Sequence, residues 1–373
     1  MSTSEVRQFT DPLTGRCITQ LTGSDERSVH GYFDIPPWSP TTGRIAFTRI
    51  AKSGDKAAIC VMEEDGSDLR QMAESSFFSS NDGAMAQWSH DGKLIYYKDR
   101  RDRETLICSI DPDTGEQESM PGSLRMLSPC APLNAYHAHA GGSFATDKAM
   151  LDHEDGGAFL QDLETGESRL VASVADCIEL HPRKDEIRGW HLYIKHTKWS
   201  RDGKRVLFVF TNEGKNLKYI ENPMVKDLYV MNSDGSGLHY VGPFHAHPIW
   251  HPNSSDILAN CFWGDEDWQS FVLINSVSGE RRIASRAMMG TGHPSYSPDG
   301  RYMVVDYVPH TTGVATLELI DTETDDIDTL VRMKVRDHTH SGTHLHPVWS
   351  RDGNKVLYAS DASGVAQLCV IDV

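Results

Sequence analysis

The chain has no excess of positive charge and no long apolar run, and each absence excludes a class of protein. Lys and Arg number 36 against 53 Asp and Glu, so the formal net charge is -17. An acidic surface disfavours nucleic acid and anionic membranes as partners, and it repels anionic ligands unless a local positive centre such as a metal receives them. No apolar stretch approaches the roughly 20 residues that span a bilayer.

Targeting signals and paired cysteines are also missing. The opening residues show no basic start followed by an apolar core, so no secretory signal is predicted. The seven cysteines are scattered, odd in number and form no C-x-x-C pair, which is typical of reduced thiols in a cytoplasmic protein. A Gly-rich phosphate loop and a G-x-S-x-G elbow are absent as well, which argues against a nucleotide enzyme and a serine hydrolase.

What the chain does have is an internal repeat over nearly its whole length. The motif is an aromatic residue, Ser, any residue, Asp, Gly and a basic residue, followed by an apolar run. Complete or degenerate copies start at seven aromatic residues 46 to 56 positions apart, namely Trp38, Trp88, Phe144, Trp199, Trp250, Tyr296 and Trp349. A second apolar strand and an Asx-Gly type turn follow each copy. Such a repeat of short strands is typical of β-propellers.

The sequence therefore predicts an all-β fold, a single seven-bladed β-propeller over residues 1–373. The last repeat stops at Val373, before its fourth strand. We expect the N-terminal strand to complete this last blade, formed by residues 342–373 plus 8–22, because closure removes exposed sheet edges. Insertions near 176–188 and 212–222 are expected as loops. The repeat aromatics are expected in the core rather than as sugar platforms.

The histidines are not placed at random. Four of the 18 stand three residues before a repeat aromatic: His196, His247, His293 and His346. Four hits in seven slots is roughly a 10⁻⁴ event by chance. Because this position begins the innermost strand, we expect the four rings to converge at one mouth of the channel. A single such histidine is more often a packing residue, but a converging set marks a metal or catalytic site.

Two of these histidines have a second histidine two positions earlier, His245 before His247 and His344 before His346. Residues i and i+2 of a strand face the same side, so each His-x-His pair can chelate one metal ion. Imidazole suits Zn, Mn, Fe, Ni and Cu, so the ligand type alone does not choose among them.

Segments at both ends of the chain resemble the oligogalacturonate lyase family. GTHLHPVWSRDG from Gly342 resembles the last blade of that family, and GTGHPSYSPDG from Gly290 resembles its metal-binding segment in blade six. The stretch from Thr14 to Phe33 is similar to its opening strand and a following His-x-x-Phe. The repeat itself is shared with TolB-like propellers, whereas the His-x-His-Pro and Gly-x-His placements are more specific.

The resemblance implies roles for individual residues. His293, His344 and His346 would bind a divalent metal, most often Mn²⁺ in that family, with Zn²⁺, Ni²⁺ and Fe²⁺ as alternatives. His247 would be the general base. Where the family has a metal-binding Gln, this chain has Ser341, which becomes the candidate for a further ligand. The candidate substrate-binding residues are His196, His245, Lys195, Lys198 and Lys226.

The function expected from this resemblance is metal-dependent cleavage of short, pectin-derived oligogalacturonides by β-elimination. The partner would be a small anionic oligosaccharide, with no nucleic acid or membrane, and the protein would be a monomer or a small homo-oligomer. Two alternatives stay open. One is a TolB-like binding module without catalysis, and the other is a metal-dependent hydrolase or isomerase in which the open metal position activates water.

Overall fold

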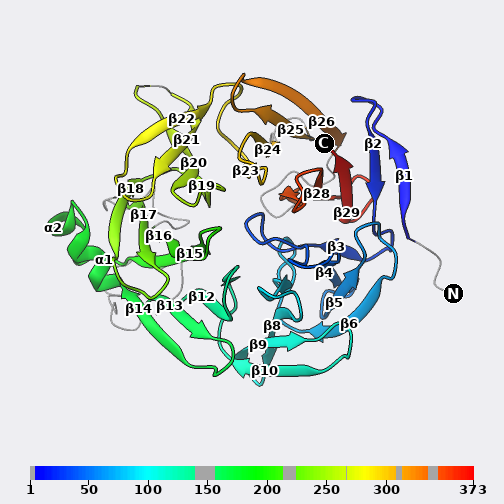
Figure 1. The fold of residues 1–373 in the computed structure, drawn as a ribbon, viewed down its shortest axis with the longest axis horizontal. Helices are drawn as coiled ribbons and strands as arrows, with labels where there is room; N and C mark the ends of the chain where they lie inside the picture. Colours follow the sequence, from blue (N-terminus) through cyan, green and yellow to red (C-terminus); the bar gives the residue numbers. More distant parts are fainter. Residues whose placement is uncertain (1–4, 139–155, 213–223, 266, 308–312, 335–342) are drawn as a thin grey trace. The chain divides into compact units, whose positions relative to one another are not determined.

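The computed structural model describes residues 5–138, 156–212, 224–265, 267–307, 313–334 and 343–373. Within these residues the chain forms seven antiparallel sheets, the blades of a seven-bladed β-propeller (Figure 1), which confirms the predicted fold class. Internal contacts divide the chain into unit 1, Met1–Gly122 with Ser285–Val373, and unit 2, Ser123–Ala284. No helix in the described part is both long and apolar enough to cross a bilayer.

Unit 1 contains three sheets of four strands each. The first is β3 (Arg27–Val29), β4 (Ile45–Ile50), β5 (Ala57–Met62) and β6 (Arg70–Ser75). The second is β7 (Gln87–Trp88), β8 (Ile95–Arg101), β9 (Glu104–Ile110) and β10 (Gln117–Pro121). The third is β23 (Ser295–Tyr296), β24 (Tyr302–Tyr307), β25 (Val314–Asp321) and β26 (Asp326–Lys334).

The remaining sheet of unit 1 joins the two ends of the chain. Its order is β1 (Arg7–Thr10), β2 (Cys17–Gln20), β29 (Gln367–Asp372), β28 (Lys355–Ser360) and β27 (Val348–Trp349). Gln20 of β2 lies opposite Cys369 of β29 in an antiparallel pair. The predicted closure by the N-terminal strand is therefore confirmed. Strand β1 adds a fifth, fully exposed strand that the repeat pattern did not distinguish.

Polar contacts fasten the N-terminal segment to the neighbouring sheet of β3–β6. The carboxylate of Glu5 accepts hydrogen bonds from both terminal nitrogens of Arg49, at 3.2 and 2.7 Å, and from the backbone N–H of Gly23 at 2.9 Å. The amide nitrogen of Gln367 in β29 donates to two backbone carbonyls of the loop after β2. These bonds hold the closing strand from both sides.

Unit 2 contains three sheets and both helices. The sheets are β11 (Met126–Leu127), β12 (Leu133–Ala138), β13 (Gly157–Asp162), β14 (Ser168–Ser173); β15 (Tyr193–Trp199), β16 (Arg205–Thr211), β17 (Lys226–Asn232), β18 (His239–Pro243); and β19 (Ala246–Trp250), β20 (Asp256–Phe262), β21 (Gln269–Asn275), β22 (Arg281–Ser285). The insertion at 176–188, expected as a loop, forms α1 (Val174–Leu180) and α2 (Lys184–Ile187) instead. Ser173 and Asp176 form a capping box that starts α1. Most of the second insertion lies outside the described residues.

Within each unit, consecutive sheets pack face to face through apolar clusters. The predicted core role of the repeat tryptophans is confirmed, since all five are at most 7% exposed. Their indole N–H groups also explain the choice of Trp. Those of Trp88, Trp250 and Trp349 donate to the backbone carbonyl just before the aromatic residue of the preceding repeat, at 3.0, 3.0 and 3.1 Å.

The Ser-x-Asp-Gly turns of the repeat share one hydrogen-bond pattern. In the last copy, Asp352 accepts from the Ser350 hydroxyl at 2.6 Å and from the backbone N–H of Asn354 at 3.2 Å. The hydrogen bond from Ser350, followed by that from Asn354, lowers the pKa of Asp352. The same Ser–Asp contact recurs in three other copies, at Asp91, Asp202 and Asp299.

The position three residues before the repeat aromatic has an unusual backbone. Met85, His196, His247 and His346 all have φ between 48° and 58°, in the left-handed region. Such a conformation costs a non-glycine residue about 1 kcal/mol or more. In β15 and β19 the ladder register shifts at this point, which marks a β-bulge. A bulge changes the direction in which a side chain points, so these histidines do not follow the regular alternation of side chains along their strands.

Candidate metal centre

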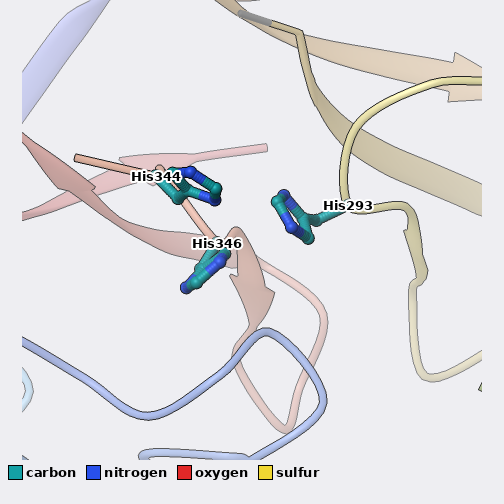
Figure 2. A group of neighbouring side chains, drawn as sticks. All are labelled: His293, His344 and His346. Carbon is teal, nitrogen blue, oxygen red and sulfur yellow. The ribbon is translucent and has the colours of Figure 1, made fainter. Parts of the chain in front are cut away.

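Three histidines of unit 1 lie close together, just before the first strands of two neighbouring sheets (Figure 2). His293 precedes β23, and His344 and His346 precede β27. One ring nitrogen of each lies within 4.8 Å of the others, and within the described residues this is the only such group of three or more His, Cys, Asp or Glu. His293 and His346 are buried, at 7% and 2% exposure, and His344 is half-buried.

The donor set fits a divalent metal. Three nitrogens in a tetrahedral site with bonds of about 2.05 Å lie about 3.3 Å apart, and the three ring nitrogens here lie within 4.8 Å of one another. The ring centroids are 4.5 Å apart for His293 and His346, and 5.3 and 5.4 Å apart for the pairs with His344. Three imidazoles leave at least one position of the ion open to water or substrate, as in catalytic rather than structural sites.

A buried carboxylate ties the two histidine segments together. Asp306 in β24 is 2% exposed. Its Oδ1 accepts from the backbone N–H of His293 at 2.7 Å, and its Oδ2 accepts from that of His346 at 3.2 Å. Both oxygens also lie 3.1 Å from Nδ1 of the His293 ring. Burial alone would raise the pKa of Asp306, but the charge and hydrogen bonds of His293 outweigh it and lower that pKa to about 2.

Gly292 allows this carboxylate to lie so close. It has φ +62°, and a Cβ atom at this position would lie 1.6 Å from the backbone oxygen of Asp306 and 2.7 Å from Oδ1. Only glycine fits this approach. The glycine directly before His293 therefore has a steric cause.

The loop after β3 supplies the aromatic wall of the centre. The ring of Tyr32 packs edge-on against His346 at 4.9 Å, and that of Phe33 lies 5.1 Å from His293. His30 is buried beside His346, and this burial lowers its pKa to about 4, so it is neutral at pH 7. A second carboxylate, on Asp82, lies 3.8 Å from Nδ1 of His346.

The predicted general base lies in unit 2. His247 is half-buried with φ +51°, and Nδ2 of Asn260 in β20 lies 3.4 Å from its Nδ1. His245, two residues earlier, packs its ring edge-on against Phe262 at 5.1 Å. The amide of Asn260 occupies one side of the His247 ring, so Nε2 is the nitrogen directed away from it.

Positive charge also acts on His196, another histidine of unit 2. Loss of solvent contact, followed by nearby positive charge, lowers the pKa of His196 well below its usual value; the cations that contribute are Lys198, Arg125 and Lys195. Lys198 is buried and donates to the backbone oxygen of Pro248. Lys226 lies over the ring of Phe244, 5.8 Å from its centre.

The structure thus brings together the three histidines expected to bind metal. Ser341 lies outside the described residues. The convergence of all four in-register histidines stays a prediction. Sequence reasoning missed Asp306, although a charged residue inside the apolar run of β24 was a visible signal, because buried carboxylates almost always have a specific partner. It also missed Tyr32, Asp82 and Arg125, for which the sequence offers no comparable signal.

Known proteins resemble this chain in structure and not in sequence. No family model matches it, and no curated protein sequence does. Two solved oligogalacturonate lyases, one in complex with manganese and one from Vibrio parahaemolyticus, have TM-scores of 0.71 and 0.72; each is 18% identical and covers 99% of this chain and 96% of its own. The β-propeller domain of the Trilobed protease from Pyrococcus furiosus has a TM-score of 0.58 at 11% identity, covering 88% of this chain and 92% of its own. At such identities the likeness establishes the fold.

Proposed function

We propose that this protein is a metal-dependent lyase that cleaves short oligogalacturonides by β-elimination. The observation that carries the proposal is the cluster of His293, His344 and His346, on a fold shared with oligogalacturonate lyases. One of those lyases was solved in complex with manganese, which makes Mn²⁺ the first metal to test.

The chemistry explains why a metal centre suits this substrate. The proton at C5 of a uronate is α to a carboxylate, so its removal places a second negative charge beside the first. A divalent cation held by the three histidines would neutralise that carboxylate and stabilise the charge that develops. It would also give an anionic substrate a positive centre on a chain of net charge -17.

His247 is the proposed general base. It takes the C5 proton, the electron pair of the C5–H bond forms the C4–C5 double bond, and the C4–O bond breaks. The products are an unsaturated uronate and a sugar alkoxide, which becomes a hydroxyl by taking a proton from water. A base at Nε2 needs the ring hydrogen on Nδ1. Asn260 can receive that hydrogen through its amide oxygen when the amide is turned by 180° relative to the arrangement described.

The cations around His196 support an anionic substrate. Lys195 and Lys226, with the polar rings of His196 and His245, are the proposed substrate-binding groups, and Arg125 joins them from its place beside His196. Lys198, which donates to Pro248, is proposed to contribute its charge from a buried position. The seven free cysteines, five of them buried, support the proposed cytoplasmic location.

The test follows ultraviolet absorbance of an unsaturated product during incubation with digalacturonate and Mn²⁺, with and without EDTA. We expect a chelator-sensitive rise that is lost in His247→Ala and kept in His239→Ala, a histidine of β18 in the same unit whose ring bonds only backbone oxygens. Reducing-end release without absorbance would identify a hydrolase instead. If His247→Ala kept full activity, the base assignment would be wrong.

A further inference from the structure

We infer that Asp306 is a positioning residue that prepares His293 and His346 for the metal before any ion arrives. The inference rests on the metal centre of the proposed function and is independent of the substrate. It concerns which nitrogen of His293 is available and how the two segments are held, and both follow from the contacts of one carboxylate.

The first step concerns hydrogen-bond roles. The backbone N–H groups of His293 and His346 can only donate, and each takes one oxygen of Asp306. Both oxygens are thus acceptors, and the carboxylate has no hydrogen of its own to give. Its contact with Nδ1 of His293, at 3.1 Å from each oxygen, therefore requires the ring hydrogen on Nδ1. The lone pair of that ring then lies on Nε2.

The second step concerns the metal. A histidine ligand commonly donates its other ring N–H to a carboxylate, which fixes the ring and makes the ligating nitrogen more basic. Asp306 supplies this arrangement and adds a feature of its own. By bonding the backbone of His346 as well, it links the segment before β23 to the segment before β27. One buried side chain thus sets the tautomer of one ligand and the separation of two.

Asp306→Asn replaces one acceptor oxygen by a hydrogen-bond donor with little change in side-chain volume. An amide offers one oxygen and one NH₂ group. If its oxygen keeps the bond to the His293 backbone, its NH₂ group meets the N–H of His346, donor against donor. The NH₂ group also favours an unprotonated Nδ1 on His293, which moves the ring hydrogen to Nε2 and blocks the ligating nitrogen. Outer partners of metal-bound histidines typically contribute 10- to 100-fold in affinity, so we expect a loss in that range.

The chain offers a matched control. Asp227 in β17 is another buried carboxylate bonded to a histidine: it lies 3.2 Å from Nε2 of His181 and accepts from the Tyr240 hydroxyl at 3.0 Å. Its side chain is 4% exposed, against 2% for Asp306. None of the three metal candidates belongs to this pair. Asp227→Asn should therefore lower the thermal midpoint without changing metal affinity.

The experiment has two readouts on full-length protein stripped of metal. Calorimetric titration with Mn²⁺ should show 10- to 100-fold weaker binding by Asp306→Asn and unchanged binding by Asp227→Asn. Imidazole ¹⁵N spectra at pH 8, with the His293 signal identified by its loss in His293→Ala, should show hydrogen on Nδ1 in the wild type and on Nε2 in Asp306→Asn.

Each outcome decides the inference. Binding by Asp306→Asn within twofold of wild type would reduce Asp306 to a packing role, and so would a wild-type His293 with its hydrogen on Nε2. The wild-type spectrum decides even when the variant does not fold. A wild type that binds no Mn²⁺ but has the Nδ1 hydrogen would overturn the proposed function while supporting the tautomer assignment.

Discussion

Gly292 provides the sharpest test of how the fold holds the metal centre. A Cβ atom there would lie 1.6 Å from the backbone oxygen of Asp306, and real Cβ atoms essentially never come within 3.0 Å of such an atom. In Gly292→Ala the backbone at residue 292 and the backbone of Asp306 must therefore separate by about 1.4 Å. Metal–ligand distances tolerate about 0.2 Å, so this displacement removes His293 from the ligand set.

The effect of Gly292→Ala has two causes, backbone strain and a steric clash, and a control variant separates them. Alanine at positive φ costs about 1–2 kcal/mol of stability wherever it stands. Gly115→Ala carries only this cost, because Gly115 has φ +79° and nothing lies within 4 Å of the added Cβ. Gly292→Ala carries it together with the clash. We expect Mn²⁺ affinity to fall at least about 100-fold in Gly292→Ala, beyond the effect of an outer partner, and to be unchanged in Gly115→Ala.

The assay is calorimetric Mn²⁺ titration, paired with urea unfolding of the metal-free proteins. Both variants should lose a similar part of their stability from the strained backbone, and Gly292→Ala should lose more. Wild-type affinity in Gly292→Ala would refute the reasoning, because it would mean that the loop moves aside without disturbing His293.

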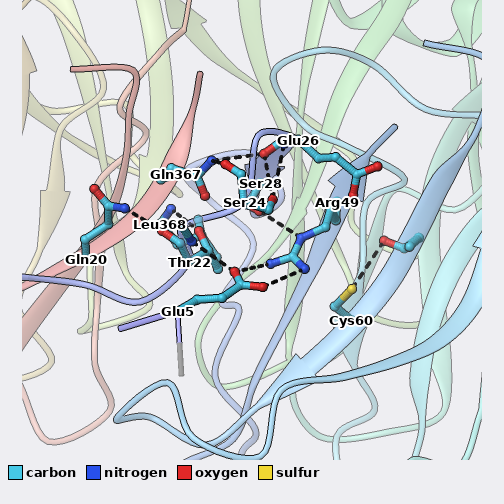
Figure 3. Close-up of polar contacts among 12 residues, drawn as sticks. Glu5, Gln20, Thr22, Ser24, Glu26, Ser28, Arg49, Cys60, Gln367 and Leu368 are labelled. Carbon is cyan, nitrogen blue, oxygen red and sulfur yellow. Dashed lines mark hydrogen bonds and ion pairs between the residues drawn. The ribbon is translucent and has the colours of Figure 1, made fainter. Parts of the chain in front are cut away.

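Three further predictions concern stability. Glu5→Ala should lower the free energy of unfolding by about 1–2 kcal/mol, since it removes a two-pronged, partly buried ion pair with Arg49 (Figure 3). Asp25→Ala, which breaks a largely exposed pair with Lys52, should change urea unfolding little. Trp250→Phe should cost about 1 kcal/mol beyond lost area, because the indole hydrogen bond goes; an unchanged urea midpoint would contradict this. Asp352 has a lowered pKa, so its contribution is full above the unfolded value of about 3.9 and is lost as pH falls through the lower folded value. The difference in Tm between wild type and Asp352→Asn should therefore shrink from pH 7 to pH 3, and a constant difference would show that the charge plays no part.

The repeat made the fold predictable from the sequence. Each copy encodes its own turn and two apolar strands, and at Trp88, Trp250 and Trp349 an indole bonds the preceding copy. Local information was therefore enough to predict seven sheets and the closure by β2. The three metal candidates were predicted from the resemblance of their two segments to oligogalacturonate lyases. The repeat by itself showed only that His293 and His346 share one position relative to the repeat aromatic.

Only the tertiary structure decided what surrounds those histidines. Asp306 lies 13 residues after His293 and 40 before His346, and no periodicity links the three. The helices at 174–187 are likewise absent from the repeat pattern. A repeat specifies backbone pairing within one sheet. The contacts of a buried carboxylate depend instead on which side chains from two sheets meet once both are packed.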